Sequence, residues 1–588
     1  MNLRGEIMKT TGEILEKYIR RKISQVELSK LIGVSPQYIS NIINDLKGPS
    51  ENFLDKFYKI FDVSAEDKKK ISEYEELRRL PKKIQEEITL FRQDEIIQEK
   101  KHRLPTSNIV LDGEILPNDE IYFFNEKEIQ VFPKFEEDDE DLFAIVVKSG
   151  HYEPKFHYLD MLIFSKQKKI NFEEYDLPNG LHVILHQDNS APVVTTTVMY
   201  HVGAKDDLPG KSGFAHFFEH LLFEGTKNIP RSRWFDIVSA HGGDNNAFTD
   251  VDKTYYYETV PSNNLQLALW MESERLLHPV INQIGVDTQK EVVKEEKREG
   301  TDNVPYGKII YMPVVQNHLF DKHPYKHPTI GSMDDLNSAK LEDFIRYNHR
   351  YYNPNNAVLV VAGDFQKDQA KSWIETYFGP IKNREAKPVR NYPMDAPITQ
   401  TKKVTDYDAN ITAPAKVLAW RTPKMTEQDA RVMDFIQALL ANGESARLYK
   451  KMVEEKKEVL QFISYTCNYE DIGILMIAAV AQDAPLEQLT RDMDSEIERL
   501  QTELISEKEY EKLLNSFETS FIANNSDVRG IAYSLAVDYT FYKDTNLINK
   551  ELDLYRKVTR EDIRRVAKQY LNANQRLEID YLPEKKSN

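Results

Sequence analysis

Apolar and polar positions along this chain follow patterns that divide it into five stretches. Residues 1–68 place apolar side chains three and four apart, which predicts short amphipathic helices. Residues 69–119 begin as a run of Lys, Glu, Arg and Gln with sparse apolar positions, which predicts a solvated helix or charged linker. Short apolar runs, among them 120–125, predict strands, so residues 120–169 are expected to form a small β-rich fragment around the acidic run 136–141.

From residue 170 onward, strands and long helices alternate. INFEEYDLPNGLHVILHQ (170–187) has the pattern of a strand, an Asn-Gly turn and a second strand, which predicts a hairpin. A strand followed by helices occurs twice, starting at VTTTVMYHVG (194–203) and at AKVLAWRTP (415–423). NNAVLVVAGDF (355–365) predicts a buried strand that closes the first half. The fold class is therefore α+β multidomain: an all-α N-terminal part, the β-rich fragment, and two similar α/β lobes at 170–385 and 386–588.

Composition restricts the possible functions. The net charge of −17 argues against a protein that coats nucleic acid along its whole length, although a small DNA-binding module remains compatible with it. With Cys467 as the one cysteine, neither an intrachain disulfide nor a cysteine metal cluster can form. Neither a secretory signal nor a membrane-spanning apolar stretch is found in the sequence, so we expect a cytoplasmic protein that does not associate with membranes.

The segment SGFAHFFEHLLFEGT (212–226) contains the candidate metal-binding and catalytic residues. It predicts a helix whose buried side is apolar, formed by Phe214, Phe217, Phe218, Leu221 and Leu222. His216 and His220 are four residues apart and so lie on one helix face, where they can bind one metal ion together. Glu219 directly precedes His220 and is close enough to act as the base that activates a water molecule. This is H-x-x-E-H, the inverted zincin order.

A catalytic zinc ion takes three protein ligands and keeps one open position. The best third ligand lies in TQKEVVKEEKREG (288–300). If the direction midway between Val292 and Val293 marks the buried face, Glu296 falls within about 10° of it and Glu295 about 110° away. A carboxylate at the centre of an apolar face requires a partner, and zinc would supply one. Gln289, two turns earlier on the same face, is expected to support this ligand.

Further motifs occur in order along the chain. The pentad is followed 76 residues after His220 by the Glu296 helix. GGDNNAFTDVDKTYYYETVP (242–261), HPYKHPTIGSMDDL (323–336) and YYNPNNAVLVVAGDF (351–365) complete the set. Together they resemble the pitrilysin/insulinase family of zinc metallopeptidases, over about residues 170–585. The resemblance implies one Zn2+ per chain held by His216, His220 and Glu296, and Glu219 as the general base.

The resemblance also implies how substrate and partner bind. Asn246, Ala247 and Thr249 match the family's edge strand, on which an extended peptide or unfolded protein pairs by β-augmentation. Family members need two pairs of lobes that face each other around a chamber, and this chain has one, so a dimer is expected. Some members carry an arginine and a tyrosine in the second lobe that help bind substrate. Arg447 matches the arginine, but Leu460 or Gln461 stands at the tyrosine position, which favours a heterodimer with a related non-catalytic subunit over a homodimer.

Residues 24–44, SQVELSKLIGVSPQYISNIIN, resemble a helix-turn-helix of the phage-repressor type. Gly33 permits the turn, Ser35 is a suitable N-cap and Pro36 suits the first helical position. The expected core residues are Leu28, Ile32, Val34, Ile39 and Ile42. In double-stranded DNA, Gln25, Gln37 and Asn41 would face the major groove and Lys47 a phosphate. The alternative is a small helical bundle that does not bind DNA.

Part of the β-rich fragment resembles the beginning of a LexA-like self-cleaving peptidase. The serine of that family is absent, with His151 in its place, and the later lysine strand is missing, so serine-lysine chemistry is not expected. Three functional hypotheses remain. The chain is a zinc endopeptidase with a DNA-binding module, a transcriptional regulator whose peptidase-like half senses or dimerises, or an accidental fusion of two unrelated proteins.

Overall fold

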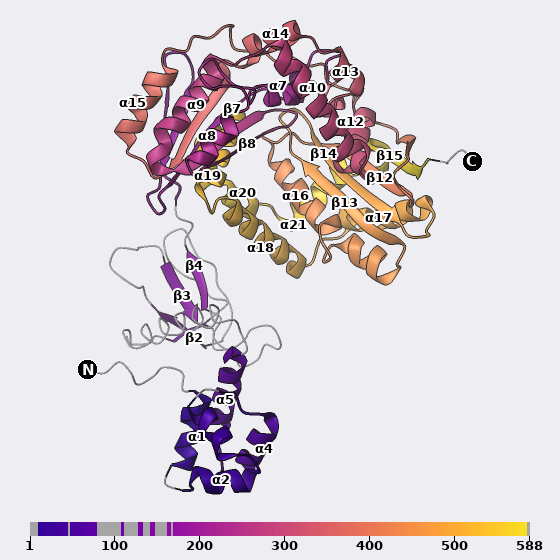
Figure 1. Cartoon of the computed structure of the whole chain (residues 1–588). Helices are drawn as coiled ribbons and strands as arrows, with labels where there is room; N and C mark the ends of the chain where they lie inside the picture. The colour runs from indigo at the N-terminus through magenta and orange to yellow at the C-terminus, as the bar shows by residue number, and fades with distance from the viewer. Residues whose placement is uncertain are drawn as a thin grey trace. The chain divides into compact units, whose positions relative to one another are not determined.

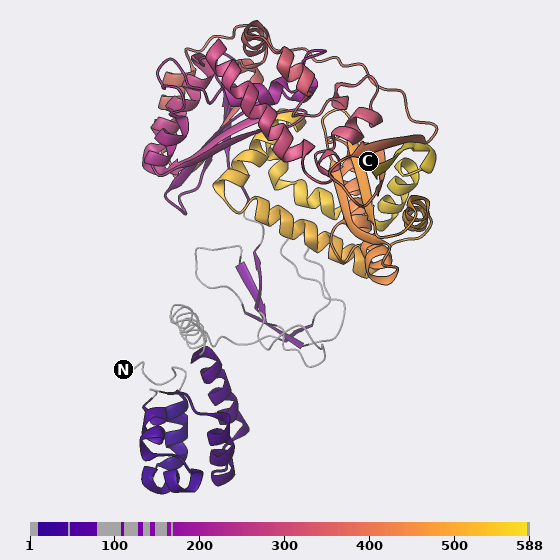
Figure 2. The ribbon, with the colours of Figure 1, turned by 45° about the vertical axis from the view of Figure 1, so that its right-hand side comes forward.

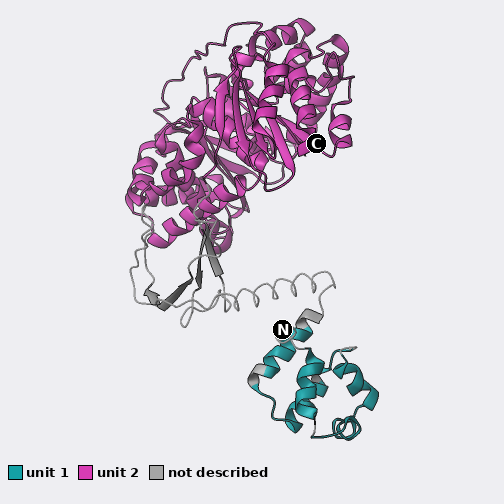
Figure 3. Ribbon diagram, turned by 90° about the vertical axis from the view of Figure 1, so that its left-hand side faces the viewer, with its two compact units in different colours: residues 1–168 teal, residues 169–588 magenta. Residues whose placement is uncertain are grey.

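The computed structural model describes residues 10–20, 22–44, 47–78, 108–110, 128–132, 142–146, 161–165 and 169–584. The chain forms two units, residues 1–168 and 169–588, which Figure 3 colours separately. None of the helices in the described ranges combines the length and the apolar character that crossing a bilayer requires.

The first unit begins with a bundle of five helices. They are α1 (Thr11–Ile19), α2 (Gln25–Ile32), α3 (Pro36–Ile43), α4 (Glu51–Ile60) and α5 (Ala65–Arg78). Gly33 ends α2 with φ of +81°, and the Ser35 hydroxyl caps α3 with Pro36 in its first turn, as predicted. Leu28, Ile32, Ile39 and Ile42 are buried in the bundle core, against which Val34 packs partly buried. The fifth helix continues to Arg78, past the predicted boundary at residue 68, and Ile71 on it still belongs to the bundle core.

Four strands follow in an antiparallel sheet of order β1-β2-β3-β4. They are β1 (Asn108–Val110), β2 (Glu128–Phe132), β3 (Leu142–Val146) and β4 (Met161–Ser165). The predicted strand at 120–125, position 151 and most of the predicted linker 69–119 lie outside the described residues.

The second unit contains two mixed sheets (Figure 1). The first has the order β5-β6-β10-β7-β9-β8 and the second the order β11-β15-β12-β14-β13. The strands of the first are β5 (Glu173–Asp176), β6 (His182–Gln187), β7 (Val193–Tyr200), β8 (Asp244–Thr249), β9 (Thr254–Pro261) and β10 (Ala357–Gly363). Those of the second are β11 (Lys402–Asp408), β12 (Ala415–Thr422), β13 (Val459–Cys467), β14 (Gly473–Ala481) and β15 (Arg576–Pro583).

The two sheets repeat one topology. Apart from β5, the strands of the first sheet occur along the chain and across the sheet in the same order as those of the second. In each sheet the last strand, β10 or β15, enters the interior, parallel to one neighbour and antiparallel to the other. The predicted hairpin is present as β5 and β6. This repeat confirms the expectation of two similar lobes and places β8 and β13 at equivalent edges.

Helices cover both sheets. In the first lobe they are α7 (Phe214–Leu221), α8 (Trp234–Ala240), α9 (Leu265–Leu277), α10 (Gln283–Lys297), α11 (Gly307–Ile310), α12 (Pro313–Leu319), α13 (Met333–Ser338), α14 (Leu341–Tyr351) and α15 (Lys367–Phe378). In the second they are α16 (Gln428–Ala441), α17 (Leu486–Thr502), α18 (Glu507–Asn524), α19 (Val528–Val537), α20 (Glu551–Arg556) and α21 (Arg560–Tyr570). The largest core includes residues of α7, α9, α14 and α15 on one face of the first sheet.

The lobes exchange helices. The other face of the first sheet, which includes Ile184 and Val360, packs against Ile531 and Leu535 of α19 from the second lobe. In return, helix α12 of the first lobe packs on the second sheet. Figure 2 shows the gold helices of the second lobe extending beneath the magenta sheet. A division at residue 385 therefore separates the two sheets but not their cores, and residues 169–588 behave as one compact unit.

Candidate metal centre and nucleic-acid interface

Helix α7 buries the apolar side that the sequence predicted, namely Phe214, Phe217, Phe218, Leu221 and Leu222. Two polar side chains of the same helix, His216 and Glu219, are buried as well. Because an isolated buried histidine or carboxylate is unfavourable, both require partners in the fold.

The start of this helix is held by a side chain from outside it. Gly213 has φ of +87°, and a Cβ at this position would lie 2.8 Å from the Gly331 Cα atom. Asp207, in the preceding loop, accepts hydrogen bonds from the backbone N–H groups of residues 213, 214 and 215 at 2.8, 3.1 and 2.9 Å. Its carboxylate therefore satisfies three donors at the positive end of the helix.

Replacing Asp207 with alanine should lower the free energy of unfolding by about 2–4 kcal/mol, because it leaves N–H groups of the helix without an acceptor. Urea denaturation followed by tryptophan fluorescence measures this effect, since Trp234, Trp270, Trp373 and Trp420 all lie in the second unit. Asp236→Ala is the control. It removes a surface ion pair with Arg233 and should change stability by less than about 0.5 kcal/mol. Equal stability of the two variants would show that Asp207 does not hold the helix.

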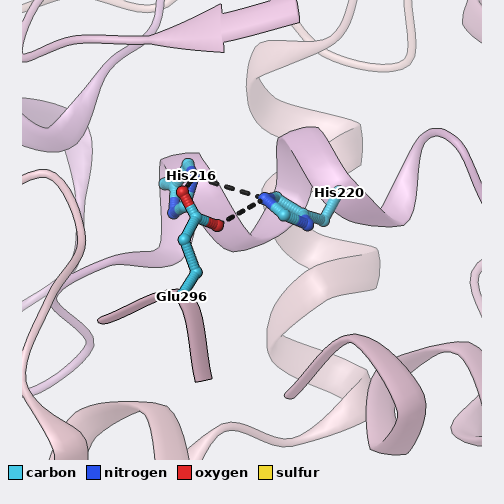
Figure 4. Close-up of side chains that lie close together, drawn as sticks. All are labelled: His216, His220 and Glu296. Atoms are coloured by element: carbon cyan, nitrogen blue, oxygen red, sulfur yellow. Dashed lines mark hydrogen bonds and ion pairs between the residues drawn. The ribbon is translucent and has the colours of Figure 1, made fainter. Parts of the chain in front are cut away.

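Glu296 of α10 reaches both histidines of α7 (Figure 4). Its Oε1 lies 3.5 Å from His216 Nε2 and its Oε2 lies 3.2 Å from His220 Nε2, and the two Nε2 atoms are 3.3 Å apart. A zinc ion with bonds of about 2.0–2.1 Å in tetrahedral geometry separates its ligand atoms by about 3.3–3.4 Å. The 3.3 Å between the two imidazole nitrogens matches this spacing, and one carboxylate oxygen of Glu296 lies beside each nitrogen, so the donor set fits a zinc ion with the fourth position open.

Glu296 was selected on the premise that the buried face of its helix lies midway between Val292 and Val293, and this premise was wrong in one respect. Val293 is buried, but Val292 is 43% exposed, and the Glu296 side chain is 47% exposed rather than central on an apolar face. The buried line of α10 runs through Gly285, Val286 and Val293, so Glu296 lies at its border. Glu295 is also exposed and pairs with Arg298 at 2.7 Å, away from the histidines.

Glu219 is positioned as a buried carboxylate beside these ligands. Thr249 of β8 donates a 2.6 Å hydrogen bond to its Oε2, and burial raises the pKa of Glu219 to about 7. Burial and the neighbouring His220 lower the pKa of His216 to about 4. For His220, burial lowers the pKa, but the hydrogen bond to Glu296 and the charges of Glu219 and Glu296 together raise it above its usual value. Metal binding requires neutral imidazoles and an ionised carboxylate, so zinc would compete with protonation of His220.

Asn246, Ala247 and Thr249 lie on β8, which is an edge strand of the first sheet. Asn246 is exposed and Ala247 partly buried. Thr249 contacts Glu219, a role that the sequence analysis did not predict. The outer edge of β8 carries no paired strand within the described residues, which is the arrangement that β-augmentation needs.

Gln289 contacts a different candidate ligand from the one predicted. Its Oε1 lies 3.3 Å from His220 Nδ1, not against Glu296, because it stands two helical turns before Glu296 and beside α7. Its Nε2 donates to Glu224, a buried residue that the sequence analysis missed. The signal for Glu224 was available, since it follows the metal helix directly in the motif FEGT.

Arg447 lies in the second lobe and is already paired there. Its guanidinium makes a bidentate ion pair with Glu509, at 2.8 and 3.0 Å, and its side chain is 9% exposed. Contact with substrate would require this pair to separate. Leu460, at the position compared with the family's tyrosine, is exposed on the edge strand β13.

The DNA-reading candidates lie on the surface of the first unit. Gln25 and Gln37 are exposed and Asn41 is partly buried. Gln37 Nε2 donates to Asn41 Oδ1 at 3.0 Å, one turn apart on α3. Lys47 is exposed, with its Nζ 5.3 Å from the centre of the Tyr38 ring.

Three family descriptions match parts of the chain. Residues 182–332 match "Insulinase (Peptidase family M16)" and residues 338–517 match "Peptidase M16 inactive domain". Residues 14–68 match "Helix-turn-helix". The first description covers most of the first lobe, including the pentad, and the second covers the end of the first lobe and much of the second.

Similar proteins include zinc proteases. The zinc protease PqqE of Helicobacter pylori is 29% identical over 409 residues, covering 68% of this chain and 91% of that protein. A crystal structure of a protease from Helicobacter pylori aligns with a TM-score of 0.66 and 27% identity, covering 70% of this chain and 99% of that one. The periplasmic protease PqqL from Escherichia coli aligns with a TM-score of 0.58 and 18% identity, over 71% of this chain and 48% of that one.

Proposed function

Since this chain belongs, through residues 182–332 and 338–517, to the insulinase family, peptidase family M16, we propose that it is a zinc-dependent endopeptidase. Its substrates are peptides or small unfolded proteins. The observation that carries the proposal is the convergence of His216, His220 and Glu296, whose candidate ligand atoms all lie within 4.8 Å of one another. Bound there, zinc supplies Lewis acidity for attack by water on a peptide carbonyl.

Glu219 moves the protons in this mechanism. Thr249 holds its Oε2, so Oε1 is the oxygen that takes a proton from the attacking water. The carboxylate can accept that proton and then release it to the nitrogen of the departing amine. Water attack and amine departure thus use one side chain in turn.

The edge of β8 aligns the substrate. An extended peptide adds to this edge through backbone hydrogen bonds, with Asn246 and Ala247 along the strand and Thr249 next to Glu219. Since pairing uses the backbone, recognition depends mainly on an extended substrate rather than on one side chain.

The active assembly is a dimer. The second unit spans about half of the PqqL chain, which supports pairing with another unit of the same kind. The partner is a second copy or a related subunit that lacks the pentad. The Arg447–Glu509 ion pair favours the related subunit as the partner. In a homodimer, Arg447 would have to bind substrate, but it is already paired with Glu509.

The enzyme is tested directly by cleavage. The full chain, alone and with candidate partner subunits, is incubated with zinc and a library of internally quenched peptides. We expect cleavage within the peptides that stops when a chelator removes zinc and returns when zinc is restored. Zinc binding without cleavage in every combination would favour the alternative, a regulator whose peptidase-like unit senses or dimerises.

The first unit forms a DNA-binding module. The hydrogen bond between Gln37 and Asn41 leaves Gln37 Oε1 as an acceptor and Asn41 Nδ2 as a donor. This pair complements the N6 donor and N7 acceptor that adenine presents in the major groove. The match of residues 14–68 to a helix-turn-helix supports the same reading.

Asn41→Ala should weaken binding of the full chain to its selected DNA sequence by about 10-fold or more, since a bidentate base contact contributes roughly 1–3 kcal/mol. The sequence is first selected from random duplexes, and affinity is then measured by mobility shift at several salt concentrations. Asn52→Ala, which removes an exposed amide on α4, should leave affinity unchanged. Absence of salt-sensitive DNA binding by the unaltered chain would contradict the module.

A further inference from the structure

Glu224 lies three residues beyond helix α7 and is buried to 5% exposure. Its Oε1 accepts a 2.6 Å hydrogen bond from Gln289 Nε2, and Arg231 pairs with both of its carboxylate oxygens. Arg231 also donates to the Thr288 hydroxyl at 2.8 Å, directly before Gln289 on α10. A chain of hydrogen bonds thus leads from Arg231 through Glu224 to Gln289.

This series of hydrogen bonds ends on His220, one of the proposed metal ligands. Gln289 Oε1 lies 3.3 Å from His220 Nδ1. An amide donates only through nitrogen and accepts only through oxygen. Because Glu224 accepts from the amide nitrogen, the amide oxygen faces the imidazole, and His220 Nδ1 must carry the proton. The lone pair is then on Nε2, the atom that lies beside Glu296 and His216.

Packing holds in place the hydrogen bonds that lead from Arg231 through Glu224 and Gln289 to His220, which we call the relay. A Cβ at Gly285 would lie 3.3 Å from Glu224 Cγ, so the glycine lets α10 approach the carboxylate closely. The relay acts on one histidine only, since the buried His216 Nδ1 has no hydrogen-bond partner among the described residues. Orientation of His220 is therefore set from α10, the helix that also supplies Glu296.

We propose that Glu224 is a positioning residue of the metal centre. Acting through Gln289, it fixes the proton of His220 on Nδ1 and presents Nε2 to zinc. This inference rests on the proposed function, because it requires zinc to bind at His216, His220 and Glu296. In this arrangement Arg231 holds the Glu224 carboxylate in place. The negative charge of Glu224 then acts on His220 through the neutral amide of Gln289.

Glu224→Gln in the full chain tests the proposal. The Arg231 guanidinium only donates hydrogen bonds, so the new amide turns its oxygen to Arg231 and its nitrogen to Gln289. Gln289 must then turn over and present its own N–H groups to His220 Nδ1, which places the imidazole proton on Nε2, where zinc binds. Zinc affinity, measured by competition with a chelator, should fall about 10–100-fold.

Two further variants make the result specific. Glu274 is a buried carboxylate that accepts from Thr226 and Asn228 at 3.0 Å each, and Glu274→Gln should leave zinc affinity within about threefold of the unaltered chain. The double variant Glu224→Gln with Gln289→Glu restores the order of donors and acceptors, because the new carboxylate accepts from His220 and from the new amide. It should recover the affinity that Glu224→Gln loses.

The outcomes separate the two proposals. If the unaltered chain does not bind zinc, the proposed function itself fails. If it binds zinc but Glu224→Gln binds as tightly as Glu274→Gln, Glu224 does not position His220. If Glu224→Gln is weak and the double variant stays equally weak, the loss does not arise from the amide orientation, and the relay is likewise rejected.

Discussion

Replacing Glu219 with glutamine is expected to lower kcat/KM for peptide cleavage by about 1000-fold or more while zinc remains bound at one ion per chain. Glutamine has nearly the same size and can still accept from Thr249, but it cannot take a proton from water. Loss of a positioned general base reduces rates by about 10²–10⁴-fold, and here one carboxylate serves both proton transfers. Steady-state kinetics with a quenched peptide and metal analysis of the same sample measure both quantities.

The Glu219 variant separates catalysis from metal binding. Its control is Glu295→Gln, which removes a carboxylate from α10 that pairs with Arg298 rather than with the histidines. The control should retain both zinc and activity. Cleavage by the Glu219 variant within tenfold of the unaltered chain would exclude this residue as the base.

Glu296→Gln should lose the bound zinc itself, whereas Glu219→Gln should lose only activity. The amide oxygen carries no net charge and is a poor replacement for a carboxylate ligand, so zinc affinity should fall by more than the 10–100-fold typical of an outer partner. We expect an undetectable zinc content after gel filtration and no peptide cleavage. Melting temperature should stay close to that of the metal-free unaltered chain, because the Glu296 side chain is half exposed.

Glu295→Gln is again the matched control, one residue away on the same helix. It should keep one zinc ion per chain. If Glu296→Gln also kept its zinc, the third ligand would have to come from another residue, and the tetrahedral arrangement of His216, His220 and Glu296 would not be the metal site.

Local spacing predicted the helix that carries the two histidines well. Two histidines four residues apart share a face whatever the surroundings, so α7 and the position of Glu219 followed from helical geometry alone. Glu296 was harder, because it lies 76 residues further on. Periodicity selected the residue that the fold brings beside the two histidines, but on a partly incorrect premise, since Val292 faces solvent. A helical pattern identifies apolar residues, but the neighbouring elements decide which of them are buried.

The contacts that support the site were not predictable in the same way. Asp207 caps α7 from a loop seven residues before the first helical residue, Phe214, so the short-range capping pattern does not include it. Glu224 and Gln289 are 65 residues apart and meet only because α10 packs beside α7. Thr249 was assigned to the substrate edge, yet its hydroxyl faces inward to Glu219.

At the level of whole helices and sheets, contacts between distant segments were likewise not predictable from local patterns. The repeated pattern of strands and helices predicted two similar lobes, and the strand orders agree. The exchange of α12 and α19 between the sheets was not predicted, because an amphipathic helix shows that one face is buried but not which sheet covers it. Residues 1–68 were easier, since their core is formed between helices close in sequence.

Anomalous X-ray diffraction at the zinc edge, on crystals of the full chain grown with one equivalent of zinc, tests the central claim most directly. The expected result is a single anomalous peak within about 2.0–2.2 Å of His216 Nε2, His220 Nε2 and one Glu296 oxygen, with the fourth position directed to the Glu219 side. A peak at any other group of residues, or no peak in crystals that diffract well, would contradict a zinc peptidase centre at α7 and α10.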